Sequence, residues 1–507
     1  MSRALIFAFM PLRKKDELHT LIHSLGKGEK KFFRMLSSAT DGVKNYVRLF
    51  SAIEKMKVYD EQKVKRAFAG TTLAKNLASE KQYLLKQIIY SLRVFHAENS
   101  ASLRVDSRIA EIEALMDKRM FNFCKRLLQK AKEEAEQNEL QPQLMSIHHL
   151  SAKLAIRSGN YPYLYKTNMD ALPGLRKTTQ QFLEQEEMRA ISYKIFSIIS
   201  KEGNNPAKRI KEIDRLMKNP LLTAPPKNAM FYTMIYYYQA HNFYQYHKGN
   251  IENAYKLNQT LVQLFEKQPE KIRQNAQTYF SFLRNLSNRA YVQGRFAECY
   301  QCLTKIERLD DDYARDISTS LRTDIRINAF EIRAELLYTE GKFVELVEVC
   351  QGAGEFIQRN AGKLRIQNIL FYNLFSAIAY AGIGKSREAL VFVNRILNDD
   401  PLSVRQDMIL FAHVLNVRIH YDLKNMELIR STSNGMLNYN KKNKLGFEAT
   451  LPLHKMFIDL LKANEDKVKC KHIIGATLSE IKPLLKVYDE KRMLHITGIW
   501  DWMKAKI

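Results

Sequence analysis

The stretch in this sequence that comes nearest to a reaction site is Ala379-Tyr-Ala-Gly-Ile-Gly-Lys-Ser386. It matches a relaxed phosphate-loop pattern, with alanine in place of the first glycine. Such a loop binds a nucleotide when it follows a strand, because its backbone N–H groups and the next helix then surround the phosphates. Here the preceding residues have the composition of a helix. We therefore interpret the stretch as a turn between helices and expect no nucleotide cofactor.

The cysteines and histidines give no recognisable metal or catalytic set. Cys299 and Cys302 have the spacing of half a zinc site, but no second pair with usable spacing accompanies them. His19 and His23 lie four residues apart without the adjacent glutamate of a metalloprotease helix. No Gly-x-Ser-x-Gly, paired-carboxylate or Cys/His nucleophile pattern stands out. We expect no metal, no cofactor and no catalytic residues, so the chain is predicted not to be an enzyme.

A short turn signature recurs along the middle of the chain and predicts where the helices around these residues begin and end. Successive glycines of this signature are 44, 46, 45, 47 and 43 residues apart. Each glycine follows a helix-like run and opens another, as expected where a positive φ ends a helix. A steady period of this size predicts stacked helical hairpins, an architecture that usually binds partners. The joints are Gly159-Asn160-Tyr161, Gly203-Asn204-Asn205, Gly249-Asn250-Ile251, Gly294-Arg295-Phe296, Gly341-Lys342-Phe343 and Gly384-Lys385-Ser386, with Lys424-Asn425 at the joint of a final pair.

These segments resemble tetratricopeptide repeats. That family places small and aromatic residues in a first helix, a glycine at the turn, then alanine, large apolar residues and a closing proline. The best-formed member has these residue types at Ala377, Tyr380, Gly384, Ala389, Val393, Ile396 and Pro401. The resemblance covers about two thirds of the chain, but the family repeat is about 34 residues long, so longer helices or loops are expected here.

The resemblance also implies a binding face. In this family the first helix of each pair lines a concave groove that holds a partner, and tyrosine and arginine are frequent hot-spot residues. The alternative is that the aromatic residues of 232–246 only pack against a neighbouring helix. The positions carried over are Tyr236, Gln239, Phe243, Tyr246, His247, Arg284, Asn288, Tyr291, Asn328, Glu331, Glu335 and Tyr338.

The charge of the 507-residue chain is strongly positive, at +26. This favours a polyanionic partner, either nucleic acid or an acidic protein surface, although lysine-rich solvated faces give the same composition. Five scattered cysteines argue against a disulfide framework and for a reducing compartment. No run approaches the roughly eighteen apolar residues of a membrane helix. We expect a cytoplasmic protein without a membrane anchor, and either Met1 or Met10 fits as the first residue.

The first hundred residues carry much of this charge and read as a compact helical region. Lys27, Lys30, Lys31 and Arg34 follow helical spacing and form one basic stripe. Such a stripe fits a helix-turn-helix unit that contacts phosphates, and equally a solvated face on a terminal helix. Residues 82–95 are apolar nearly all round, which predicts a buried helix.

Together these features predict an all-α, right-handed α-solenoid. A basic helical region (1–100) precedes the repeats (101–440), and a helical C-terminal cap follows (441–507). The expected function is non-catalytic binding of a protein or peptide, of acidic character, on the concave face. The alternative is a nucleic-acid-binding regulator that uses residues 1–100, with the repeats as a sensor. The sequence does not indicate an oligomeric state.

Overall fold

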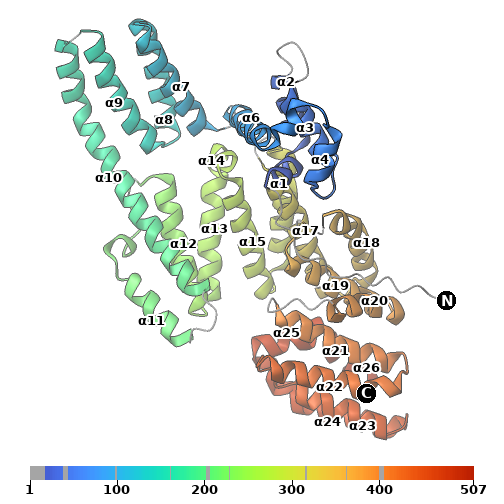
Figure 1. Ribbon diagram of the computed structural model, residues 1–507. Coiled ribbons are helices and arrows are strands. Elements are labelled where there is room, and N and C mark those ends of the chain that lie inside the picture. The colour runs from blue at the N-terminus through green and yellow to red at the C-terminus, as the bar shows by residue number, and fades with distance from the viewer. Residues whose placement is uncertain are drawn as a thin grey trace. The chain divides into compact units, whose positions relative to one another are not determined.

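The computed structural model describes residues 17–37, 44–97, 100–159, 161–200, 206–227, 229–314, 317–360, 362, 364–398 and 405–507. Within these ranges the regular elements are helices and none is a strand (Figure 1). Helices pack mainly against their neighbours in sequence. The predicted all-α class is thus confirmed. None of the described helices combines the length and the apolar character needed to cross a bilayer.

The described residues fall into two compact units. The first lies within Met1–Tyr279 and Arg315–Thr319, and the second within Phe280–Ala314 and Ser320–Ile507. Residues within each unit contact one another more than they contact the other unit. The predicted regions 1–100, 101–440 and 441–507 have other boundaries and remain a prediction. Met1, Met10, the Gly203 joint and Pro401 lie outside the described residues.

Short helices around one apolar cluster begin the first unit. Phe33, Leu49, Phe50, Leu84 and Ile88 lie in this cluster and are almost fully buried. Asp60 begins one helix by accepting hydrogen bonds from the backbone N–H groups two and three residues on, at 3.0 and 3.2 Å. The helices are α1 (Glu17–Ser24), α2 (Lys27–Ser37), α3 (Asn45–Glu54), α4 (Glu61–Ala67), α5 (Thr72–Lys75) and α6 (Leu77–Ala97).

The prediction of a helix over residues 82–95 is confirmed, but the prediction that this helix is buried all round is wrong. They belong to α6, which buries one face through Leu84 and Ile88 and leaves about half of the Tyr83, Ile89 and Tyr90 side chains exposed. Large apolar side chains on a half-exposed helix are common, because folded proteins lack enough polar surface to cover themselves.

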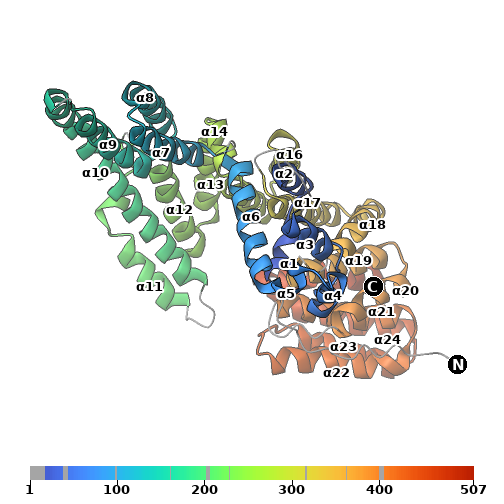
Figure 2. The same cartoon turned by 45° about the horizontal axis from the view of Figure 1, so that its top comes forward.

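The rest of the first unit is built from longer helices. Figure 2 shows α7, α8 and α9 side by side, in agreement with their mutual contacts. The long helix α10 runs unbroken for 40 residues through Pro173 and packs against both α9 and α12. The elements are α7 (Ala101–Asp117), α8 (Phe121–Gln137), α9 (Gln141–Arg157), α10 (Tyr161–Ser200), α11 (Pro206–Leu216), the 3₁₀ turn η1 (Pro220–Leu222), α12 (Phe231–His247), α13 (Ile251–Glu266) and α14 (Pro269–Gln274).

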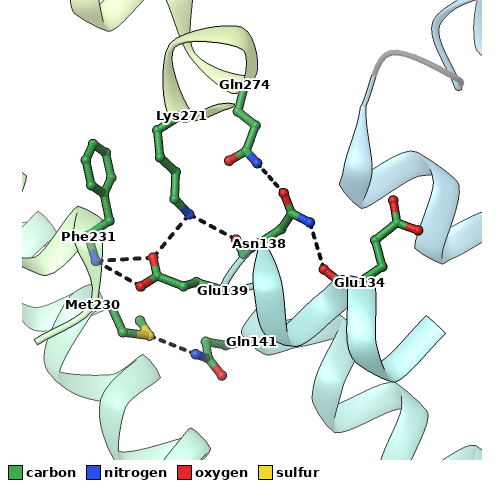
Figure 3. Close-up of polar contacts among 8 residues, drawn as sticks. All are labelled: Glu134, Asn138, Glu139, Gln141, Met230, Phe231, Lys271 and Gln274. Atoms are coloured by element: carbon green, nitrogen blue, oxygen red, sulfur yellow. Dashed lines mark hydrogen bonds and ion pairs between the residues drawn. The ribbon is translucent and has the colours of Figure 1, made fainter. Parts of the chain in front are cut away.

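A buried lysine ties three distant parts of this unit together. Lys271 of α14 is only 2% exposed, and its ammonium lies 3.2 Å from a carboxylate oxygen of Glu139 and 3.2 Å from the carbonyl oxygen of Asn138 (Figure 3). The Glu139 carboxylate also accepts the backbone N–H of Phe231, at the start of α12. Gln274 donates to the Asn138 side chain at 2.5 Å. The α8–α9 turn is thereby fastened to α12 and α14.

The second unit continues the hairpin pattern around a large apolar cluster. Helix α15 begins in the first unit and continues into the second. The helices are α15 (Ala276–Val292), α16 (Phe296–Asp312), α17 (Thr319–Thr339), α18 (Phe343–Asn360), α19 (Ile366–Gly382), α20 (Ser386–Asn398), α21 (Gln406–Asp422), α22 (Met426–Lys442), α23 (Thr450–Lys462), α24 (Lys467–Ile481), α25 (Tyr488–Ile496) and α26 (Ile499–Lys506), with the 3₁₀ turn η2 (Lys482–Lys486) before α25.

The predicted joints end these helices as expected. Gly294, Gly341 and Gly384 have φ of +73°, +71° and +77°. At each joint the residue after the glycine donates its N–H to the carbonyl five residues back, at 2.9 Å, which satisfies a carbonyl that the helix end would leave open. Gly159 and Gly249 also have positive φ, and Lys424 adopts +59° in the joint that lacks glycine. The positions of the turns are therefore confirmed wherever they are described.

Candidate peptide-binding pocket

A polar pocket of about 380 Å³ lies in the second unit. Its walls come mainly from the first helices α15, α17 and α19, with further residues from α16, the start of α21, and α25. Charged groups dominate it: four arginines and two glutamates. Its polar lining includes Arg284, Asn285, Asn288, Tyr291, Cys299, Asn328, Glu331, Glu335, Arg365, Gln367, Asn368, Arg405 and Arg492.

Helical spacing explains why α15 and α17 each present one polar face here. Arg284, Asn288 and Tyr291 follow i, i+4, i+7, so they lie on one side of α15. Glu331 and Glu335 are four residues apart on α17 and share a face in the same way. All five are positions that the tetratricopeptide resemblance implied, and one pocket brings them together.

Two of the arginines stand at helix starts. Arg365 and Arg405 are the N-cap residues of α19 and α21. Arg405 has a left-handed backbone, with φ of +54°, and its guanidinium forms two hydrogen bonds to the Asp407 carboxylate at 2.9 and 2.8 Å. Arg492 of α25 pairs with the same carboxylate at 3.2 Å. Asp407 therefore anchors two guanidiniums at one wall of the pocket.

Asp407 stays ionised in spite of its surroundings. Burial alone would raise its pKa, but the hydrogen bonds and charge of Arg405, together with the charge of Arg492, outweigh burial and lower the pKa below its usual value.

The two pocket glutamates behave in the opposite way. Burial raises the pKa of Glu331, against the hydrogen bond that it accepts from Asn368 at 2.8 Å and the charges of Arg284, Arg365 and Arg405. Burial also raises the pKa of Glu335, to about 7; Glu331 acts in the same direction, and Arg492 and Arg405 oppose it. A pocket whose carboxyl groups have a raised pKa is a candidate functional site.

The chain's own C-terminal helices cover the neighbouring part of the first-helix face. The Tyr338 hydroxyl, one turn beyond Glu335 on α17, donates to the carbonyl oxygen of His495 in α25. Further on, Arg418 of α21 donates to the Thr497 carbonyl at 2.8 Å, and Trp502 of α26 donates to Asp422 at 2.8 Å. Tyr338, expected in the groove, thus contacts residues of the same chain.

The predicted groove residues on α12 lie in the first unit and do not belong to this pocket. Tyr236 packs against Tyr193 of α10 at 5.9 Å between ring centroids, and Phe243 packs against Phe196 at 5.5 Å. The hydroxyl of Ser192, also on α10, lies 3.3 Å from the amide oxygen of Gln239. Helix packing accounts for these three residues. The rings of the remaining pair, Tyr246 and His247, are 5.4 Å apart.

The basic stripe on α2 is partly neutralised. Lys30 and Arg34 both form ion pairs with Glu54 of α3, at 3.2 and 2.5 Å, and Arg34 also lies over the Phe50 ring. Lys27 and Lys31 are exposed. Two of the four predicted basic residues therefore hold α2 against α3.

The other motifs of the sequence lie at a helix joint, in the core or in contact with backbone groups. Gly384-Lys385-Ser386 joins α19 to α20, so no strand precedes it. Cys299 and Cys302 are buried free thiols, and the Cys299 thiol donates to the Ser287 carbonyl at 3.3 Å. A His19 ring nitrogen lies 2.9 Å from the Met56 carbonyl oxygen. In the ranges that the structure describes, no three His, Cys, Asp or Glu side chains gather closely enough to hold a metal ion.

Sequence reasoning missed Arg365, Asn368, Arg405 and Arg492. Arg365 and Arg405 precede first helices by one residue, so a search one turn before each first helix would have included them. Arg492 lies 85 residues from its partner Asp407, and no local spacing predicts that approach. In comparisons with known proteins, no protein-family model matches this sequence, and no curated protein matches it.

Proposed function

We propose that this chain is a non-catalytic binding protein, a right-handed solenoid of tetratricopeptide-like hairpins with long repeats that holds a peptide segment of a partner protein. One observation carries the proposal: equivalent faces of successive first helices supply the walls of a single polar pocket. Residues from separate hairpins converge there, as a peptide lying across several repeats requires.

The pocket chemistry suits a peptide main chain. Asn285, Asn288 and Gln367 carry amide groups that both donate and accept, so they can pair with the N–H and C=O groups of a bound segment. The arginines add donors for acidic side chains. Cys299 is a poor nucleophile at neutral pH, because burial raises its pKa to about 11. These features favour binding over chemistry.

Selection from a library of linear peptides, displayed and panned against the full chain, tests the proposal. Selected peptides should bind the double variant Arg284→Ala/Asn288→Ala about tenfold or more weakly, because a lost hydrogen bond to the charged Arg284 guanidinium is worth roughly 1.5–3 kcal/mol and one to the neutral Asn288 amide about 1 kcal/mol. Fluorescence anisotropy gives the dissociation constants. Both side chains are exposed and lie at the pocket, so the fold should survive their truncation.

Arg308→Ala is the matched control, since Arg308 is an exposed arginine on α16 that does not line the pocket. Selected peptides should bind it as they bind the unchanged chain. Equal binding to all three proteins would place the peptide elsewhere and overturn the proposal.

A further inference from the structure

The pocket carries more guanidinium charge than its own carboxylates neutralise. Arg405 and Arg492 share the single carboxylate of Asp407, and Arg365 lies 4.0 Å from Asp324. Arg284 is exposed, and no ion pair joins it to a carboxylate of the described residues. Four guanidiniums thus face four carboxyl groups, Asp324, Asp407, Glu331 and Glu335. Because burial raises the pKa of both glutamates, their protonation leaves a net positive charge that favours an added anion.

Glu335 is the pocket carboxyl without a hydrogen bond to any described residue. Glu331 accepts from Asn368, and Asp407 accepts from Arg405, whereas only the backbone carbonyl of Glu335 is used, by Thr339. The charged groups around it are Glu331 on its own helix, Arg405 at the start of α21 and Arg492 on α25. A protonated Glu335 can donate its O–H to an incoming carboxylate, and an ionised Glu335 repels it.

Two further titratable side chains of the pocket, Tyr291 and Cys299, form hydrogen bonds with neutral groups. The Tyr291 hydroxyl hydrogen-bonds with Thr339 at 2.8 Å, and the Cys299 thiol donates to the Ser287 carbonyl. Burial, together with the charges of Glu298 and Glu335, raises the pKa of Cys299 to about 11, so this thiol stays neutral between pH 6 and pH 8. Burial raises the pKa of Glu331 as well, but the hydrogen bond that its carboxylate accepts from Asn368 favours the ionised form. Glu335 has no such donor among the described residues, so its protonation is the change that we connect with the pocket's affinity for an anion.

We propose that the pocket takes the side-chain carboxylate of an acidic residue in the bound segment, beside Arg284 and the Arg405–Arg492 pair, and that Glu335 shares a proton with this carboxylate. The inference rests on the proposed function and adds the ligand class and its regulation. It makes binding a proton-uptake step. The bound carboxylate favours protonated Glu335, so affinity rises as the pH falls.

The pH range follows from Glu335 itself. Its pKa of about 7 means that it is mainly protonated at pH 6 and mainly ionised at pH 8. If the ligand binds only the protonated form, affinity follows the protonated fraction and falls about tenfold between these two pH values. The ligand's own glutamates have an ordinary pKa near 4.3, so they stay ionised throughout.

The test uses fluorescein-labelled hexaglutamate, acetylated at one end and amidated at the other, titrated with the full chain at pH 6 and pH 8 and constant ionic strength. The unchanged chain should bind about tenfold more tightly at pH 6, and capped hexaglutamine should not bind. Glu335→Gln should remove the pH dependence, because the amide is neutral and still donates. Glu388→Gln, at an exposed position on α20, should retain it. Arg284→Gln should weaken binding at both pH values.

Several outcomes overturn the inference: pH-independent binding by the unchanged chain, an unaltered pH dependence in Glu335→Gln, or binding only when the peptide's C-terminus is free. Displacement of the probe by millimolar inorganic phosphate but not by free glutamate would also overturn it, because the pocket would then prefer phosphate. Library peptides that need Arg284 yet contain no acidic residue would leave the proposed function standing and remove this inference alone.

Discussion

Lys271 places a full charge where only 2% of its surface meets solvent. Its ammonium is compensated by the Glu139 carboxylate and the Asn138 carbonyl, and it lies 5.6 Å from the ring centroids of both Phe231 and Tyr232. Buried charge is tolerated only when it is paired and hydrogen-bonded, as here. The pair connects residues 132 positions apart, so it contributes long-range order to the first unit.

Lys271→Met should lower the free energy of unfolding of the first unit by about 2 kcal/mol, because Glu139 loses its cation while staying largely desolvated. Urea denaturation followed by circular dichroism measures the change. Lys267→Met, at an exposed position four residues earlier, should have almost no effect. Adding Glu139→Gln to Lys271→Met should recover part of the loss; no recovery would show that packing of the lysine stem, and not its charge, is what matters.

At the scale of the element, the hairpin joint depends on backbone conformation more than on side chains. Gly341 has φ of +71°, and a Cβ placed there would meet no atom within 4 Å. Its requirement for glycine is therefore conformational, because L-residues are strained in the left-handed region. Gly352 lies within helix α18 and is equally open, but its φ is not positive.

The same substitution should therefore act in opposite directions at these two glycines. Gly341→Ala should destabilise the second unit by about 1 kcal/mol through backbone strain. Gly352→Ala should stabilise it by up to about 1 kcal/mol, since alanine favours a helix interior over glycine. Thermal unfolding of both variants measures the difference. A stabilising Gly341→Ala would contradict the conformational explanation of the joints.

Many of the helix ends can be predicted from the sequence, because a glycine with positive φ marks them. Gly294, Gly341 and Gly384 mark helix ends because a local backbone requirement decides them. The unbroken α10 is not predictable in the same way, since its 40 residues include Pro173 and its stability comes from packing against α9 and α12. The pocket residues differ in the same way. Arg284 and Glu335 follow from the predicted helical-hairpin pattern, whereas Arg492 comes from α25, which lies outside the stretch where that pattern was predicted.

At the scale of the whole molecule, the net charge of +26 leaves a nucleic-acid-binding function as the rival proposal. The α2 stripe gives it limited support, because Glu54 already neutralises Lys30 and Arg34. The exposed lysines Lys27 and Lys31 still permit non-specific contact with phosphates.

We therefore expect the full chain to bind a 20-base-pair duplex only weakly, with affinity that vanishes by about 0.2 M salt and is the same for a shuffled sequence. Binding measured against salt concentration, with Lys27→Glu/Lys31→Glu alongside the unchanged chain, tests this expectation. Sequence preference that persists at 0.2 M salt and is lost in the double variant would favour the rival.

The contact between Tyr338 and His495 has a consequence for how the protein is divided experimentally. A fragment that stopped after α22 would keep every hairpin joint of the second unit but would lack Arg492, and Tyr338 would lose its partner. Its α17 face would be less covered and less basic than in the intact chain. Under the proposed function, peptide affinities measured on such a fragment would therefore differ from those of the intact chain.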